Sequence, residues 1–134
     1  MLKKFVRTMA YIGGIVTGFY LFASAPGIHK KKKWQHLTGW DYAHRGLYDN
    51  EHGIPENSMA AFRRAVDKGY GIELDVHLTA DNQLVVFHDD TLTRMCGMNK
   101  KISSFLYSDL MQLRLLGTEE GIPLFKDVLE LIDG

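Results

Sequence analysis

The chain has 134 residues, enough for one modest domain. Basic residues (Lys plus Arg) and acidic residues (Asp plus Glu) number 16 each, so no bulk charge points to nucleic acid or to an acidic partner. The first 33 residues hold seven basic residues and no acidic one, and this asymmetry favours a membrane-facing N-terminal end. A single cysteine, Cys96, excludes an internal disulfide.

The N-terminal segment is apolar and flanked by basic residues. Residues 8–29 carry no formal charge, and about 20 such residues span a bilayer core. We therefore predict a transmembrane anchor with its basic flank over residues 1–33. A cleaved signal peptide is the alternative, although Pro26 would follow the small residues 23–25 at the cut. The lysine run 30–33 can bind anionic lipid head groups, and it favours a cytoplasmic C-terminal side.

The rest of the chain alternates between strand and helix patterns. In chain order we expect a linker over 34–41, a strand over 42–44, a helix over 59–68 capped by Ser58 and ended by Gly69, strands over 71–78 and 84–87, a loop over 89–103, a leucine-rich helix over 109–116, and a last helix opened by Pro123. This alternation predicts an α/β fold with a mostly parallel sheet. The link from 78 to 84 is too short for a crossover helix, so that pair alone indicates an antiparallel hairpin.

The strand predicted over 71–78 has an apolar face opposite an acidic one. Glu73 and Asp75, two residues apart, would lie ~6.6 Å from each other on the same face, together with His77. Two carboxylates at that range repel each other, and a divalent cation relieves the repulsion. Oxygen ligands suit Mg²⁺, Ca²⁺ or Mn²⁺ better than Zn²⁺. The alternative is the solvent-facing side of an edge strand.

Further polar residues follow two of the other predicted strands. His44 ends the first strand and precedes Arg45, whose guanidinium fits phosphate oxygens. His88 follows the strand over 84–87. In a parallel α/β fold, residues at the C-terminal ends of strands converge on one mouth. Two imidazoles, an arginine and a metal suit phosphoryl chemistry, in which the imidazoles exchange protons with nucleophile and leaving group.

Four motifs, in this order and spacing, resemble the glycerophosphodiester phosphodiesterase family. They are "AHRG" at 43–46, "PENS" at 55–58, "IELDVHLTADNQLVVFHDD" at 72–90 and "IPLFKDVLELI" at 122–132. The resemblance implies the first part of a TIM-like barrel. It also implies hydrolysis of glycerophosphodiesters to glycerol 3-phosphate and an alcohol with Mg²⁺ or Ca²⁺, or, in membrane-anchored relatives, action on lysophospholipids.

The resemblance also implies roles for individual residues. His44 and His88 would be the general base and acid, Arg45 would bind phosphate, and Glu73 and Asp75 would ligate the metal. The substrate's own glycerol hydroxyl would attack phosphorus, and water would then open the cyclic phosphate. Glu56 and Asn57 would shape the loop over the pocket.

The sequence also departs from the family pattern. The family's third acidic metal ligand would lie beyond Gly134, and we count three strands where a barrel needs eight. We therefore expect residues 42–134 to form an incomplete barrel, and the chain alone, as a fragment or truncated product, to be inactive or nearly so. The alternative is a membrane-tethered, non-catalytic remnant that binds a phospho-head group or a partner. A related phosphoinositide-type lipase would share the paired histidines, but the remaining motifs disfavour it.

Overall fold

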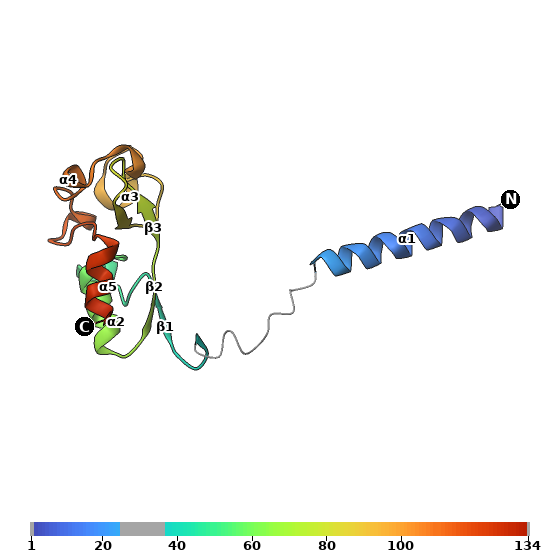
Figure 1. Cartoon of the computed structure of the whole chain (residues 1–134), viewed down its shortest axis with the longest axis horizontal. Helices are drawn as coiled ribbons and strands as arrows, with labels where there is room; N and C mark the ends of the chain where they lie inside the picture. The colour runs from blue at the N-terminus through green and yellow to red at the C-terminus, as the bar shows by residue number, and fades with distance from the viewer. Residues whose placement is uncertain (1, 25–36, 134) are drawn as a thin grey trace. The chain divides into compact units, whose positions relative to one another are not determined.

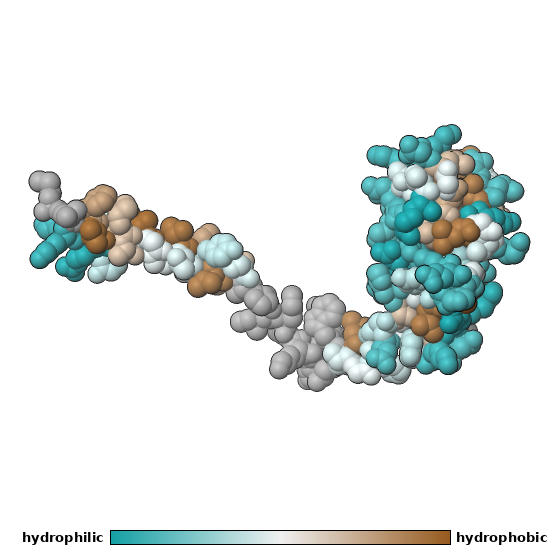
Figure 2. Space-filling model, turned by 180° about the vertical axis from the view of Figure 1, so that it is seen from behind, coloured by the Kyte–Doolittle hydropathy of each residue, from teal (hydrophilic) through white to brown (hydrophobic). Residues whose placement is uncertain are grey.

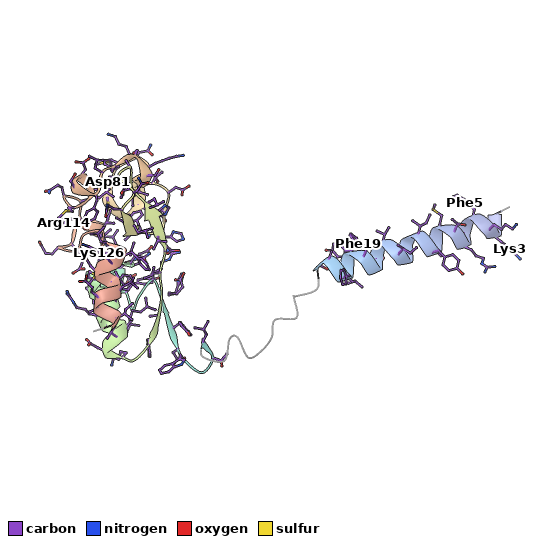
Figure 3. The ribbon with its side chains drawn as sticks, in the orientation of Figure 1. Lys3, Phe5, Phe19, Asp81, Arg114 and Lys126 are labelled. Atoms are coloured by element: carbon purple, nitrogen blue, oxygen red, sulfur yellow. The ribbon has the colours of Figure 1, made fainter. Side chains whose placement is uncertain are left out.

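A computed structural model describes residues 2–24 and 37–133, and its contacts divide the chain into two compact units, Met1–Thr38 and Gly39–Gly134. In the first unit, α1 (Leu2–Ser24) is an exposed and mostly apolar helix. Apolar side chains cover much of it, with hydrophilic ones near its N-terminal end (Figure 2). Phe5 and Phe19 point outward from it (Figure 3). By length and composition α1 is able to cross a membrane. The lysine run 30–33 lies outside the described residues.

The second unit contains four short strands, four α-helices and several tight helical turns (Figure 1). Its elements in chain order are β1 (Tyr42–His44), η3 (Asn50–His52), α2 (Met59–Asp67), β2 (Gly71–Glu73), β3 (Val76–Leu78), β4 (Leu84–Val86), α3 (Thr93–Cys96), η4 (Ile102–Ser104), α4 (Tyr107–Leu110), η5 (Leu115–Gly117) and α5 (Phe125–Asp133).

The segment β1–α2–β2 is a parallel strand–helix–strand unit, as the sequence predicts. β1 pairs with β2 in parallel, so that His44 lies opposite Glu73. The Ser58 side chain accepts a hydrogen bond from the backbone N–H of Ala61 and caps α2, as predicted. Gly69 follows the helix with φ +69°, the left-handed conformation typical of a residue that ends a helix. The C-terminal ends of β1 and β2 therefore meet at one edge.

The single strand predicted over 71–78 is wrong, because the chain changes partners in its middle. β2 pairs with β1 up to Glu73, whereas β3 pairs antiparallel with β4. The predicted hairpin between 78 and 84 is thus confirmed. At the break, the carbonyl of Asp75 accepts the N–H of Phe87 at 2.9 Å. Asp75 consequently lies between the two pairs of strands.

Three predictions in the C-terminal part are also wrong. The helix predicted over 109–116 is only the short α4, because Leu115 donates its N–H to the carbonyl of Glu120 and the chain turns back. The predicted loop 89–103 contains the short helix α3 and the turn η4. The last helix begins at Phe125 and not at Pro123. The Pro123 carbonyl accepts the N–H of Val86 in β4, so Pro123 pairs with the strand before the helix begins.

Two apolar clusters share β4 between them. Alternation along a strand places Val85 and Val86 on opposite faces, and each belongs to a different cluster. Val86 packs with Phe62 of α2 and Val128 of α5, and these two helices lie side by side (Figure 1). The other cluster holds Val85, Phe87, Leu92, Met95, Ile102, Leu110, Leu115, Ile122 and Leu124. β4 is therefore the buried strand at the centre of this unit.

Candidate active site

A tight turn at the end of β1 places two of the predicted site residues. Arg45 has φ +58° and donates its backbone N–H to the Glu73 carbonyl at 2.9 Å, which extends the pairing with β2. Gly46 has φ +80°, and a Cβ there would lie 2.9 Å from Cβ of Ala61 in α2. Only glycine therefore lets α2 pack this closely on the turn. The imidazole of His44 is left exposed, with 65% of its side-chain surface accessible.

The two predicted metal ligands both lie beside Arg45. Oε2 of Glu73 is 3.3 Å from the Arg45 backbone N and 3.8 Å from Nε2 of His44. Oδ2 of Asp75 lies 3.6 Å from Nε of Arg45, an ion-pair distance that is too long for a hydrogen bond. The structure therefore brings His44, Arg45, Glu73 and Asp75 together at one edge of the β1–β2 pair.

Glu56 is the most deeply buried carboxylate of this region, with 6% of its side-chain surface accessible. Nη1 of Arg45 donates to it at 2.8 Å, and Arg94 donates from both terminal nitrogens at 2.7 and 3.0 Å. The side-chain carbonyl of Asn50 accepts the Glu56 backbone N–H at 3.0 Å. Burial alone would raise the pKa of Glu56, but the hydrogen bonds from Arg94 and Arg45 outweigh it and lower the pKa. Glu56 therefore stays ionised and holds two cations.

Arg94 also binds the carboxylate next to His88. Its Nε and Nη2 donate to the two oxygens of Asp89 at 2.8 and 2.9 Å. Nδ1 of His88 lies 2.6 Å from Oδ1 of Asp89. The hydrogen bonds from Arg94 lower the pKa of Asp89 to about 2, and His88 adds to this against the opposing effect of burial. Nε2 of His77 lies 3.2 Å from the His88 carbonyl, so His77 contacts this loop rather than the metal-ligand pair.

Asn57 connects the β1 turn to Asp75 from within the interior. Its backbone N–H donates to the Arg45 carbonyl at 2.9 Å, and its Nδ2 donates to Oδ2 of Asp75 at 3.2 Å. Asn57 is 2% exposed and has φ +55°. Its Oδ1 is buried without a hydrogen-bond partner. A buried acceptor without a partner next to the Asp75 carboxylate is typical of a position where a further donor or an ion binds.

The oxygen atoms available as metal ligands at this site fit a hard divalent cation. Glu73 and Asp75 supply carboxylate oxygens and both are partly exposed, while no described residue donates a hydrogen bond to Oε1 of Glu73 or Oδ1 of Asp75. Mg²⁺ is commonly bound by one or two carboxylates, with waters and substrate phosphate completing its shell. Within residues 2–24 and 37–133, no group of three or more His, Cys, Asp or Glu side chains is placed to hold a metal.

Residues 44–133 match the model of the glycerophosphoryl diester phosphodiesterase family, which is well over half of the chain. The chain belongs to this family. Lysophospholipase D GDPD1 of Rattus norvegicus is 35% identical over 136 residues, which covers 91% of this chain and 42% of the relative. A glycerophosphodiester phosphodiesterase of Bacillus altitudinis is 41% identical over 98 residues, covering 68% of this chain and 39% of the relative. The chain thus spans about two fifths of the length of these curated relatives.

Solved structures of family members have the same fold. An Oleispira antarctica phosphodiesterase in complex with the product sn-glycerol-3-phosphate superimposes with a TM-score of 0.64 at 30% identity, covering 73% of this chain and 41% of that one. A glycerophosphodiester phosphodiesterase of Parabacteroides distasonis gives a TM-score of 0.59 at 38% identity, covering 70% and 37%. The family member described here therefore has the fold of the first part of a TIM-like phosphodiesterase barrel, as its sequence predicts.

Sequence reasoning missed the importance of Arg94 in this family member. Arg94 lies in α3, within the segment predicted to be a loop, and its partner Glu56 is 38 residues earlier. A separation of that length leaves no periodic signal. The one local hint is Asp89 directly after His88, since neighbouring imidazole and carboxylate groups commonly pair.

Proposed function

We propose that this chain supplies the site of a metal-dependent glycerophosphodiester phosphodiesterase that releases glycerol 3-phosphate and an alcohol, or acts on lysophospholipids. One observation carries the proposal: Arg45 lies between Glu73 and Asp75 at the edge where β1 and β2 end. A guanidinium bordered by two carboxylates can bind a phosphate that a metal ion shares with those carboxylates. The product complex of the Oleispira antarctica relative and the lysophospholipase D name of the rat relative support the two substrate classes.

The residues of this chain divide the chemistry between them. Glu73 and Asp75 would hold Mg²⁺ or Ca²⁺, which when bound neutralises charge on the phosphate. Nη1 of Arg45 is occupied by Glu56, while no described residue accepts a hydrogen bond from Nη2, which leaves that nitrogen for a phosphate oxygen. His44 takes the proton of the attacking glycerol hydroxyl as the new P–O bond forms. His88 gives a proton to the alcohol oxygen as its bond to phosphorus breaks.

The proposed domain organisation places this site on a membrane. Residues 1–33 would anchor the chain in the membrane, and residues 42–134 would form the barrel part on the cytoplasmic side. Residues 34–41 would link the anchor to the barrel part. The match with the rat relative covers 91% of this chain, so the matched region includes part of α1. Retention of the full chain in the membrane pellet after alkaline extraction, and its loss on deletion of 1–33, would support the anchor. Recovery of the full chain in the soluble fraction would contradict it.

The test of the activity is a diesterase assay on the full chain in detergent micelles. Glycerophosphocholine and lysophosphatidylcholine are supplied with Mg²⁺ or Ca²⁺, and released choline is measured. Loss of either general acid–base group lowers rates by about 10²–10⁴-fold, which we expect for His44→Ala and for His88→Ala. His52→Ala is the matched control, because His52 is exposed and, among the described residues, its side chain pairs with Asp49 alone. Equal and measurable activity in His44→Ala and the parent would refute the role of His44, whereas no activity in the parent would agree with the expectation that this chain alone is inactive.

A second candidate function is binding without turnover. It is favoured by the ligand set, because among the described residues no group of three or more His, Cys, Asp or Glu side chains is placed to hold a metal ion. Saturable binding of glycerol 3-phosphate with Mg²⁺, lost in Asp75→Asn but unaccompanied by hydrolysis, would select this candidate over the enzyme.

A further inference from the structure

We propose that Arg94 and Asp89 are positioning residues for His88. Arg94, anchored on the buried Glu56, fixes the carboxylate of Asp89, and Asp89 accepts the Nδ1–H of His88 so that Nε2 is the nitrogen that faces the substrate. This inference rests on the proposed function for the role of His88, but its geometry stands independently of any activity.

The contacts of Arg94 form two forked pairs in one guanidinium. Nε and Nη2 bind the two oxygens of Asp89 at 2.8 and 2.9 Å, and Nη1 and Nη2 bind the two oxygens of Glu56 at 3.0 and 2.7 Å. Glu56 is in turn held by Nη1 of Arg45 at 2.8 Å. Forked arginine–carboxylate pairs fix orientation as well as distance. The carboxylate of Asp89 therefore cannot rotate without breaking its hydrogen bonds to Arg94, which is itself held by the buried Glu56.

His88 needs such a support, because its side chain is 40% exposed. An exposed imidazole samples several rotamers and both neutral tautomers, and each wrong state lowers the fraction of sites ready to react. The 2.6 Å contact from Nδ1 to Oδ1 of Asp89 selects one rotamer and the Nδ1–H tautomer. When protonated Nε2 gives its proton to the departing alcohol oxygen, the ring returns to this same tautomer, and Asp89 remains unprotonated throughout.

The same chain of contacts joins both ends of the proposed site. Arg45 beside the phosphate and His88 beside the leaving group are both tied to Glu56, the first directly and the second through Arg94 and Asp89. A shift of Glu56 would thus move both groups. A purely structural role for Arg94, which would only fasten α3 to the loop of Glu56, predicts no effect on the tautomer of His88.

The test is ¹⁵N NMR of the histidine side chains in the full chain, in detergent micelles at about pH 8, where an ordinary imidazole is neutral. His88→Gln identifies the signals of His88. We expect the Nδ1–H tautomer to be the major form in the parent and in Arg63→Gln, a control at an exposed arginine of α2. We expect it to become the minor form in Asp89→Asn, with Arg94→Gln intermediate between the two.

Two results would overturn the proposal: a major Nε2–H form in the parent, or a tautomer ratio that Arg94→Gln leaves unchanged. Where the chain is active, Arg94→Gln should lower kcat by about 10–100-fold with little change in KM, as loss of a supporting partner does. Absence of hydrolysis in the parent would count against the proposed function only, because the tautomer is measured without substrate. If near-UV circular dichroism shows that Arg94→Gln is unfolded, the tautomer ratio in Asp89→Asn, a substitution that preserves side-chain shape, tests the proposal alone.

Discussion

The side chains around the end of β1 form two groups that differ in how they meet water. The open group, His44 and Glu73, is largely exposed, and its members have long contacts of 3.3 Å or more. The paired group holds Glu56, Arg45, Arg94 and Asp89, and its ion-pair contacts are 2.7–3.0 Å long around a buried carboxylate. The two groups lie within one side chain of each other, since Arg45 contacts both.

Under the proposed function, this difference separates the reacting groups from the groups that support them. A group that must accept a proton or a metal ion has to remain reachable, so it cannot be saturated by protein partners. A buried charge, in contrast, is tolerated only when partners satisfy it, because its desolvation is expensive. The paired group meets that condition, and under the proposed function it would hold Arg45 in place beside the open group.

The largest expected effect separates the two groups by stability. Glu56→Gln leaves Arg45 and Arg94 without their shared anion and should lower the free energy of unfolding by about 3 kcal/mol. Glu73→Gln removes an exposed charge from the open group and should change it by no more than about 0.5 kcal/mol. Urea unfolding followed by near-UV circular dichroism measures both. Equal losses in the two variants would erase the distinction.

The turn that supports both groups can be tested through Gly46. Gly46→Ala introduces a Cβ at positive φ and within 2.9 Å of Ala61, which should cost about 2–3 kcal/mol. Gly53 has a similar φ of +76°, but nothing lies within 4 Å of its Cβ position. Gly53→Ala should therefore cost only about 1 kcal/mol. If both variants lose the same stability, α2 does not press on the turn.

The paired group should also give a dependence of stability on acid pH. The pKa of Asp89 is lowered from 3.8 to about 2, so its contribution is complete above about pH 4 and is lost as the pH falls towards 2. The loss should reach up to about 2 kcal/mol. Melting temperatures between pH 5 and 2 should fall less steeply in Asp89→Asn than in the parent. The neighbouring Asp90→Asn serves as the control, and an identical effect of both variants would refute the assignment.

The smallest expected effect concerns α2, which begins just after the loop that carries Glu56. Oε2 of Glu120 accepts the backbone N–H of Ala60 in the first turn of α2 at 3.1 Å. Glu120→Gln keeps an acceptor but removes a negative charge from the positive end of the helix, which should cost about 0.5 kcal/mol. Glu119→Gln, next to it and exposed, should have no measurable effect. Thermal unfolding curves of Glu120→Gln and Glu119→Gln measure this difference. A larger effect at Glu119 would contradict the capping role of Glu120.

Local signals predicted much of the second unit. Ser58 and Gly69 mark the ends of α2, because capping and helix termination depend on residues adjacent in sequence. The hairpin between 78 and 84 follows from the length of its link. The break at Asp75 was not predictable, since it reflects a change of strand partner. The helix expected over 109–116 was wrong, because Leu116 has a positive φ and the chain turns back so that Leu115 donates its N–H to the Glu120 carbonyl.

The sequence by itself determined the family, the α/β fold, the apolar N-terminal helix and the residues at the strand ends, because each of these is written in periodicity or in motifs of adjacent residues. Only the tertiary structure decided which charges pair. Glu56 finds Arg94 across 38 residues, and Arg45 is divided between Glu56 and Asp75. Ion pairing depends on distance in space and on burial, and neither quantity can be read along a chain before it has folded.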